Sequence, residues 1–297
     1  MKLQPSAEIS AVLESRLHWI LDGAIGTELE RRGYPSKLPL WTSPANIERS
    51  DLVEAIHQEY LEAGATIITA NTFRSSYYTY EKGGRSWEEA KDACRAAIRI
   101  ARSTVSSANI LVAASLAPLE DCYKPRDTPS DDVLRKYHSR QVQMLASFNP
   151  DMILAETINN STEALIIAEL CADLGFPYMI SLITDGKGML LSGEDMIRLI
   201  AGLEQYSPLA ILLNCRPAEW INNDMLILKE SASGIFGAYA NAPGKPDDDG
   251  NWTRALDDVP HYIEHALMWK SMGARIIGGC CGTTPEYIKN ISAHLLP

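Results

Sequence analysis

Three of the six cysteines in this sequence occupy positions where thiols could act together. Cys280 and Cys281 stand side by side in the stretch GGCCGTTP at 278–285. Neighbouring side chains on a straight strand point to opposite faces, so these two could share a partner only if the backbone turned, as the flanking glycines permit. The third, Cys215, directly follows the apolar run LAILLN at 209–214. In a reducing compartment, cysteines at unusual spacing indicate metal ligation or catalysis rather than disulfides.

Converging thiolates favour a soft or borderline metal ion, above all Zn²⁺. If Cys215, Cys280 and Cys281 meet, three protein ligands leave a fourth position open, which is typical of catalytic rather than structural zinc. The alternative is that the paired cysteines only pack in a tight turn. The spacing favours neither interpretation, because the C-x-x-C pattern of many metal sites is absent. Two further cysteines, Cys94 and Cys171, are expected to be small buried apolar residues, the usual environment of a free cysteine.

The elements that would position these cysteines alternate regularly along the chain. Eight short runs rich in Ile, Leu and Val lack the in-out alternation of a half-solvated sheet, as expected for parallel strands buried on both faces. They are HWILDG at 18–23, TIITAN at 66–71, NILVAAS at 109–115, DMILAE at 151–156, YMISLI at 178–183, LAILLN at 209–214, GIFGAYA at 234–240 and RIIGG at 275–279.

A segment with helical periodicity follows each of these runs. The segments are 51–63, 87–105, 131–147, 162–174, 194–206, 218–230, 259–272 and 285–294. Eight strand-helix units predict a single (β/α)8 barrel, an α/β fold, over residues 1–297 as one domain. An open doubly wound sheet would show fewer repeats and a glycine-rich phosphate loop, but neither GxGxxG nor a P-loop is present. The polar loop at 241–254 is expected to be mostly solvated surface, with a lid role left open.

Polar residues at the ends of the predicted strands are the candidate site residues, because catalytic groups of such barrels gather where strands end. Besides the cysteines, these residues are Asp22, Asn71, Thr72, Glu156 and Asn214. Asp22 could instead cap a helix, and Glu156 could belong to a buried structural pair. A cap or core role is equally open for Thr72, and Asn214 could brace the cysteine turn.

Composition and charge limit the partners. The net charge of −11 gives no support for binding to nucleic acid or to an anionic membrane surface. The first residues, MKLQPSAEIS, do not read as a signal peptide, and no apolar run approaches the ~20 residues that span a bilayer. We therefore expect a cytoplasmic protein.

The sequence resembles the zinc-dependent homocysteine S-methyltransferases, a family that includes the homocysteine-binding module of cobalamin-dependent methionine synthase and the betaine- and S-methylmethionine-using enzymes. The resemblance covers nearly the whole chain and rests on motifs in a fixed order. They are LDGAIGTELERRG at 21–33, ANTFR at 70–74, AET at 155–157, LLNC at 212–215 and GGCCGTTPEYI at 278–288.

The resemblance implies roles for individual residues. In that family the three matching cysteines bind zinc, here Cys215, Cys280 and Cys281, while Asp22 and Glu156 would hold the amino-acid end of homocysteine. Backbone amides of Gly23 to Gly26 could receive its carboxylate, since they lie at a strand-to-helix turn. Thr72 and Asn214 are expected at the same substrate site.

One segment departs from the family pattern. Relatives commonly have Y-P-N after the seventh strand, whereas this chain has Tyr239-Ala240-Asn241. The missing proline is expected to affect the binding of the methyl donor more than the binding of zinc.

The implied reaction is methyl transfer from an activated donor to the homocysteine sulfur, giving methionine in methionine biosynthesis. S-methylmethionine or S-adenosylmethionine suits this chain, because folate- and cobalamin-dependent relatives carry extra domains. Betaine stays open, although no aromatic cage for its quaternary ammonium is evident in the sequence. The sequence also leaves open a corrinoid protein partner, a non-catalytic zinc or thiol-binding barrel, and a zinc hydrolase. All-thiolate ligation argues against the hydrolase.

Overall fold

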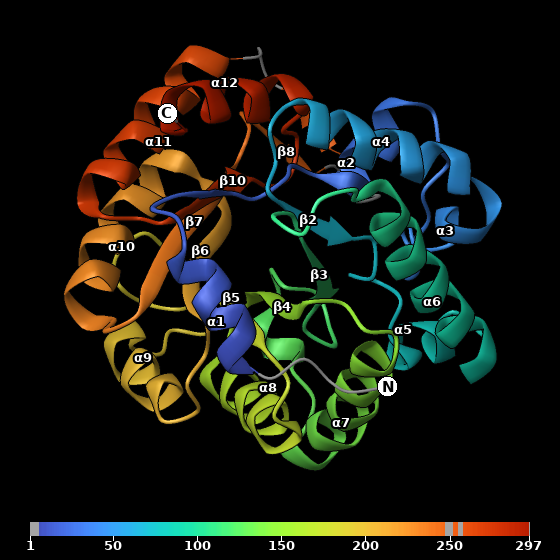
Figure 1. Ribbon diagram of the computed structural model, residues 1–297. Coiled ribbons are helices and arrows are strands. Elements are labelled where there is room, and N and C mark those ends of the chain that lie inside the picture. The colour runs from blue at the N-terminus through green and yellow to red at the C-terminus, as the bar shows by residue number, and fades with distance from the viewer. Residues whose placement is uncertain (1–5, 247–251, 255–257, 297) are drawn as a thin grey trace.

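Eight parallel strands form the centre of the molecule. The computed structural model describes residues 6–246, 252–254 and 258–296. Figure 1 shows the strands as a ring with the helices arranged around it. The strands are β1 (Trp19–Ile20), β2 (Ile67–Ala70), β3 (Leu111–Leu116), β4 (Met152–Ile158), β5 (Tyr178–Leu182), β6 (Ala210–Pro217), β7 (Ile235–Asn241) and β10 (Ile276–Gly279). Each overlaps one of the eight predicted runs, so the strand prediction is confirmed.

The sheet closes on itself. Its strand order is β1-β10-β7-β6-β5-β4-β3-β2, and every pairing is parallel. An isolated parallel bridge between Leu21 and Ile67 joins the first and last strands of this order. The predicted (β/α)8 barrel is therefore confirmed.

Helices surround the barrel, and all eight predicted segments are helical. These are α4 (Ser50–Glu62), α6 (Trp87–Thr104), α7 (Asp131–Ser147), α8 (Ser161–Leu174), α9 (Met196–Glu204), α10 (Ala218–Ser231), α11 (Val259–Met272) and α12 (Pro285–Leu295). Typical start signals are present, such as the reciprocal capping box of Ser86 and Glu89 at α6. In the described part of the chain, no helix has the length and apolar character needed to cross a bilayer.

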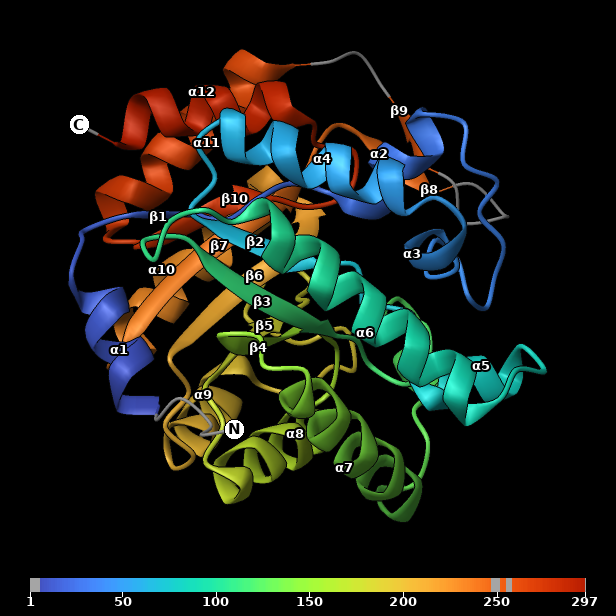
Figure 2. The ribbon, with the colours of Figure 1, turned by 45° about the vertical axis from the view of Figure 1, so that its right-hand side comes forward.

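Further elements, which the periodicity did not predict, lie at the two ends of the barrel. They are α1 (Ser6–Glu14), α2 (Ile25–Arg31), α3 (Ala45–Glu48), α5 (Tyr77–Lys82), the 3-10 turn Pro125–Asp127, and the antiparallel pair β8 (Gly244–Pro246) and β9 (Trp252–Arg254). Figure 2 shows α1 at one end and the β8–β9 hairpin beside α2 at the other. The hairpin lies within the loop that we expected to be mostly solvated surface.

The apolar core has two layers because each strand is buried on both faces. One layer lies between the barrel and its helices, and the other fills the barrel interior. Ile9 and Leu13 of α1 join the interior layer, where the indole nitrogen of Trp19 donates to the Leu13 carbonyl at 3.0 Å. Helix α1 thus closes the end of the barrel opposite the strand carboxyl termini.

Gly237 in β7 is required by the close approach of β10. A Cβ at this position would lie 1.9 Å from the carbonyl oxygen of Ile276, a backbone atom held in the sheet. We expect Gly237→Ala to lower the free energy of unfolding by about 2–3 kcal/mol, because overpacking that forces side-chain and backbone shifts costs about 1–3 kcal/mol and the atom met here is backbone. Urea unfolding followed by circular dichroism measures the change.

Gly234 provides the matched control for this substitution. It precedes the same strand, and a Cβ there meets no atom within 4 Å. Gly234→Ala should leave the urea midpoint nearly unchanged. Equal midpoints for the two variants would show that β7 and β10 can separate freely.

Candidate functional site

The three strand-end cysteines converge at the carboxyl end of the barrel. Cys215 lies in β6, and Cys280 and Cys281 follow β10 directly. Their sulfur atoms all lie within 4.8 Å of one another, and the Sγ atoms of Cys215 and Cys281 are 3.9 Å apart. The tertiary structure therefore brings together three thiols that are separated by up to 66 positions in sequence.

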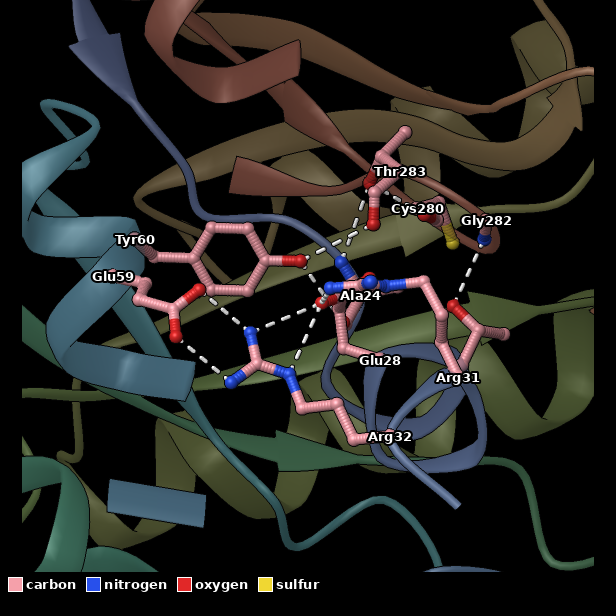
Figure 3. Close-up of polar contacts among 10 residues, drawn as sticks. Ala24, Glu28, Arg31, Arg32, Glu59, Tyr60, Cys280, Gly282 and Thr283 are labelled. Atoms are coloured by element: carbon pink, nitrogen blue, oxygen red, sulfur yellow. Dashed lines mark hydrogen bonds and ion pairs between the residues drawn. The ribbon is translucent and has the colours of Figure 1, made fainter. Parts of the chain in front are cut away.

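The Cys280-Cys281 turn is held by the chain segment that follows β1 (Figure 3). The Thr283 hydroxyl donates to the Cys280 carbonyl at 2.7 Å and accepts from the Ala24 amide at 3.3 Å. The Gly282 amide donates to the Thr27 hydroxyl at 3.0 Å. These bonds turn the backbone after β10 so that both cysteines face the same side.

A second set of contacts fixes the segment after β1 itself. The buried carboxylate of Glu28 accepts from Arg31 and Arg32, and Arg32 also pairs with Glu59 of α4 at 2.7 Å (Figure 3). The Tyr60 hydroxyl bridges the carbonyls of Ala24 and Thr283 at 3.0 and 3.2 Å. The first and last units of the barrel are thereby joined beneath the cysteines.

Cys215 reaches the cluster through an irregularity in β6. Its φ of 59° lies in the left-handed region, which few non-glycine residues occupy, and the pairing with β7 shifts register between Asn214 and Pro217. Asn214 stabilises the strand just before this point, because its Oδ1 accepts from Ser181 Oγ at 2.8 Å and from the Thr157 amide at 3.2 Å. Its amide nitrogen lies 3.8 Å from the sulfur of Cys280.

The donor set fits a tetrahedral metal ion. Zinc–sulfur bonds of about 2.3 Å imply sulfur atoms roughly 3.8 Å apart in a regular tetrahedron. The separation between Cys215 and Cys281 meets this value, and the limit of 4.8 Å for the whole cluster requires only small side-chain movements. The cluster is thus a candidate metal centre with three thiol ligands.

Two carboxyl groups lie on the same cavity as the cysteines. Asp22 accepts from the Thr69 amide at 2.8 Å, and Glu156 is bonded to the hydroxyls of Ser115 and Tyr239. In the described residues, no lysine or arginine pairs with either carboxylate. Burial raises the pKa of both groups, and the charge of Glu156 adds to the rise at Asp22. A cationic ligand group beside them would be favoured, because it would compensate buried negative charge.

The remaining sequence-predicted residues fall into two groups. Gly23 lines the cavity, and a Cβ there would meet the Tyr60 ring at 2.8 Å. Thr72 and Asn214 are fully buried and are not among the lining residues. The Thr72 hydroxyl donates to the Ser115 carbonyl at 2.7 Å. The capping role considered for Asp22 is wrong, since helix α2 begins after Ala24 without a side-chain cap.

The cavity of about 490 Å³ has an aromatic lining that the sequence did not reveal. Five rings contribute to it, from Trp41, Phe73, Tyr123, Tyr239 and Trp252. Trp41 and Phe73 meet edge to face with ring centroids 6.3 Å apart. Each ring comes from a different loop or strand end, so no local motif could signal the group.

The altered segment Tyr239-Ala240-Asn241 forms the end of β7 and contributes to this wall. The Ala240 amide donates to the Tyr262 hydroxyl at 3.0 Å, a bond that proline could not form. The preceding residue, Tyr239, reaches Glu156 with its hydroxyl at 3.2 Å. The departure from the family pattern thus ties β7 to α11.

A second cavity of about 410 Å³ shares Tyr123, Cys215 and Trp252 with the first. It also holds a group of three potential ligands, Glu219, His261 and His265.

The hydrogen bonds behind His265 argue against metal binding by this second group. The Trp269 indole can only donate, so Oδ1 of Asn222 faces it at 2.7 Å. The Asn222 amide then donates to Nδ1 of His265 at 2.7 Å. His265 therefore carries its proton on Nε2, the nitrogen that faces His261 at 3.2 Å, and offers no lone pair there.

Comparisons with known proteins find the same family over nearly the whole chain. The family model described as homocysteine S-methyltransferase matches residues 19–295. Homocysteine S-methyltransferase 1 of Zea mays is 30% identical, over 93% of this chain and 94% of its own length. Selenocysteine Se-methyltransferase of Brassica oleracea var. italica is also 30% identical, over 93% and 88%.

A bacterial relative and a solved structure extend the similarity. Homocysteine S-methyltransferase YbgG of Bacillus subtilis (strain 168) is 27% identical over 96% of both chains. The metallated form of the homocysteine methyltransferase MmuM from Escherichia coli superimposes with a TM-score of 0.82 at 25% identity, over 95% of this chain and 98% of that chain.

Proposed function

The chain belongs to the homocysteine S-methyltransferase family, and from that premise we propose that it transfers a methyl group from an onium donor to the sulfur of L-homocysteine in a zinc-dependent reaction. The observation that carries the proposal is the convergence of three thiols on one cavity, beside the buried carboxylate of Asp22 and the partly buried carboxylate of Glu156. The products would be methionine and the demethylated donor.

Cys215, Cys280 and Cys281 would hold the zinc ion, leaving its fourth position for the substrate sulfur. A free cysteine thiol has a pKa of about 8.5, so a thiol is mostly protonated at neutral pH. When bound, zinc would deprotonate the homocysteine thiol and make its sulfur nucleophilic. Asn214 keeps β6 in place beneath Cys215, and the bonds of Thr283 and Thr27 keep the other two thiols in position. These contacts serve orientation rather than proton transfer.

Asp22 and Glu156 would bind the ammonium group of homocysteine. Both line the cavity that also contains the cysteines, and neither has a basic partner in the described part of the chain. A charge-assisted hydrogen bond to an ammonium would use the remaining acceptor capacity of the two carboxylates and offset the cost of removing their charge from water. One end of the amino acid would thus be fixed while its sulfur points toward the thiols.

The aromatic lining favours a positively charged donor. A sulfonium near the faces of Trp41, Phe73 or Trp252 would gain cation–π attraction, and it would lose its charge when the methyl group leaves. S-methylmethionine and S-adenosylmethionine carry such a centre, and we favour them. Betaine also fits the rings, and a corrinoid partner protein stays as a further source of the methyl group.

The chain's own contribution to the transfer step would be orientation. The homocysteine sulfur attacks the methyl carbon, a carbon–sulfur bond forms, and the donor leaves as a neutral thioether with the electron pair of the broken bond. Holding both molecules in line makes the step effectively intramolecular. No nucleophile of the protein is required.

The test is methionine formation from L-homocysteine by the purified zinc-loaded protein, with S-methylmethionine, S-adenosylmethionine and betaine supplied in parallel. We expect turnover with a sulfonium donor, and methionine from betaine alone would identify the alternative donor instead. If no donor yields methionine although homocysteine perturbs the spectrum of the cobalt-substituted protein, a separate methyl carrier is required. If homocysteine leaves the metal unperturbed, the acceptor assignment is wrong.

A second acceptor can be tested in the same assay. The Brassica relative is named for selenocysteine, whose side chain has one carbon fewer than that of homocysteine. With Asp22 and Glu156 fixed in the barrel, a shorter amino acid would place its selenium farther from the cysteine cluster. We therefore expect homocysteine to be the better acceptor in direct competition.

A further inference from the structure

Tyr123 contacts the cysteine cluster from a loop that no sequence motif marked. It lies between β3 and α7, and its hydroxyl oxygen is 3.0 Å from the sulfur of Cys215 and 3.3 Å from the carbonyl oxygen of the same residue. The side chain lines both cavities together with Cys215 and Trp252. It therefore touches one of the three thiols directly, at the wall that the two cavities share.

The backbone around Tyr123 is held by the neighbouring barrel unit. The buried side-chain amide of Asn159 donates to the Cys122 carbonyl at 2.9 Å. The Leu119 amide donates to the buried carboxylate of Glu163 at 2.8 Å. The Tyr123 amide is itself bonded to the Asp121 carboxylate at 3.0 Å. Tyr123 is thus presented to Cys215 from a supported segment.

A buried hydrogen bond next to this loop adds to the support. Glu163 also contacts Nε2 of His138 at 2.7 Å, and both side chains are only 1% exposed. The chain of contacts runs from α7 and α8 through Glu163 to the loop. A single anchored loop therefore sets the position of the phenol relative to β6.

The direction of the hydrogen bond follows from the state of the sulfur. A cysteine that ligates a metal ion is a thiolate and has no proton to donate. The phenol must then be the donor, to the sulfur at 3.0 Å, with the carbonyl as a weaker second acceptor. Both acceptors belong to Cys215, the residue with the left-handed backbone, so one hydroxyl restrains its side chain and its main chain together.

We propose that Tyr123 is a positioning residue for Cys215, whose hydroxyl keeps this thiolate oriented toward the other two and so raises the affinity of the site for its metal ion. The inference rests on the proposed zinc-dependent function, because it assigns Cys215 as a ligand. Hydrogen-bond partners of metal ligands commonly account for about 10- to 100-fold in metal affinity. No other described residue donates a hydroxyl to any of the three sulfurs.

The experiment compares Tyr123→Phe with the wild-type protein by chelator competition for zinc and by the thiolate-to-metal absorption of the cobalt-substituted form. We expect zinc affinity to fall about 10- to 100-fold and the cobalt absorption to shift, since the phenylalanine ring keeps the packing but cannot donate. The matched control is Tyr178→Phe. That substitution removes a phenol that donates to the Tyr206 carbonyl at 3.0 Å. It should leave both readouts unchanged.

The possible outcomes separate the role of Tyr123 from the proposed function. Equal zinc affinities for the wild-type protein and Tyr123→Phe would overturn the proposal, as would an equal loss in both tyrosine variants. If the wild-type protein binds zinc but transfers no methyl group, the proposed function fails while the affinity comparison still decides the role of Tyr123. If the wild-type protein binds no metal at all, both proposals fall.

Discussion

Replacing any one of Cys215, Cys280 or Cys281 by serine is expected to abolish stoichiometric zinc binding and methyl transfer together. Structural four-ligand sites bind zinc with about 10–16 kcal/mol, so one ligand accounts for about 2.5–4 kcal/mol, or roughly 70- to 900-fold in affinity. A serine hydroxyl is not ionised at neutral pH and does not replace the thiolate. Metal analysis of the purified variants and the methionine assay measure the two losses.

The same chain offers a matched control for these variants. Cys171 is fully buried in α8, outside the three-thiol cluster. Cys171→Ala should retain the full zinc content and activity, at a modest cost in stability from the small cavity it leaves. Full turnover by a zinc-free variant of the cluster would reject the proposed mechanism, and loss of zinc from the Cys171 variant would show that the protein is too fragile for the comparison.

Glu156→Gln and Asp22→Asn are expected to weaken homocysteine binding and to leave the metal in place. Removing the charge leaves the substrate ammonium without a full counter-charge in a buried site, which costs about 2–4 kcal/mol, or roughly 30- to 1000-fold in affinity. Homocysteine titrations of the cobalt-substituted variants report binding independently of the methyl donor. Their zinc content should match that of the wild-type protein, because neither carboxylate is a ligand in the three-thiol cluster.

A surface glutamate serves as the control for the charge change. Glu169 pairs with Arg135 at 2.9 Å, with both side chains substantially exposed. Glu169→Gln should bind homocysteine like the wild-type protein, because an exposed pair contributes little and lies on the helical shell. If Glu156→Gln and Asp22→Asn also bind homocysteine normally, the ammonium is held elsewhere and the orientation of the substrate must be reversed or displaced.

The barrel and its three-thiol cluster could be predicted from the sequence for a physical reason. Strands buried on both faces must be apolar throughout, and the helices that cover them must repeat every 3.6 residues, so each unit is visible locally. Once eight units are recognised, closure places all strand carboxyl ends on one face. Cys215 and the Cys280-Cys281 pair then have to lie there, as do Asp22 and Glu156.

The rest of the site was decided by tertiary structure. The aromatic lining draws single rings from separate segments, Trp252 belongs to a hairpin within a loop expected to be mostly solvated, and Tyr123 reaches Cys215 across 92 positions. Loop conformations of this kind depend on distant contacts, such as the Asn159 and Glu163 bonds to residues 119–122. The residues next to a loop position in the sequence do not indicate which distant residues that position contacts. The sequence therefore determined the scaffold and the meeting of the three thiols, whereas only the folded chain decided which other side chains line the cavity.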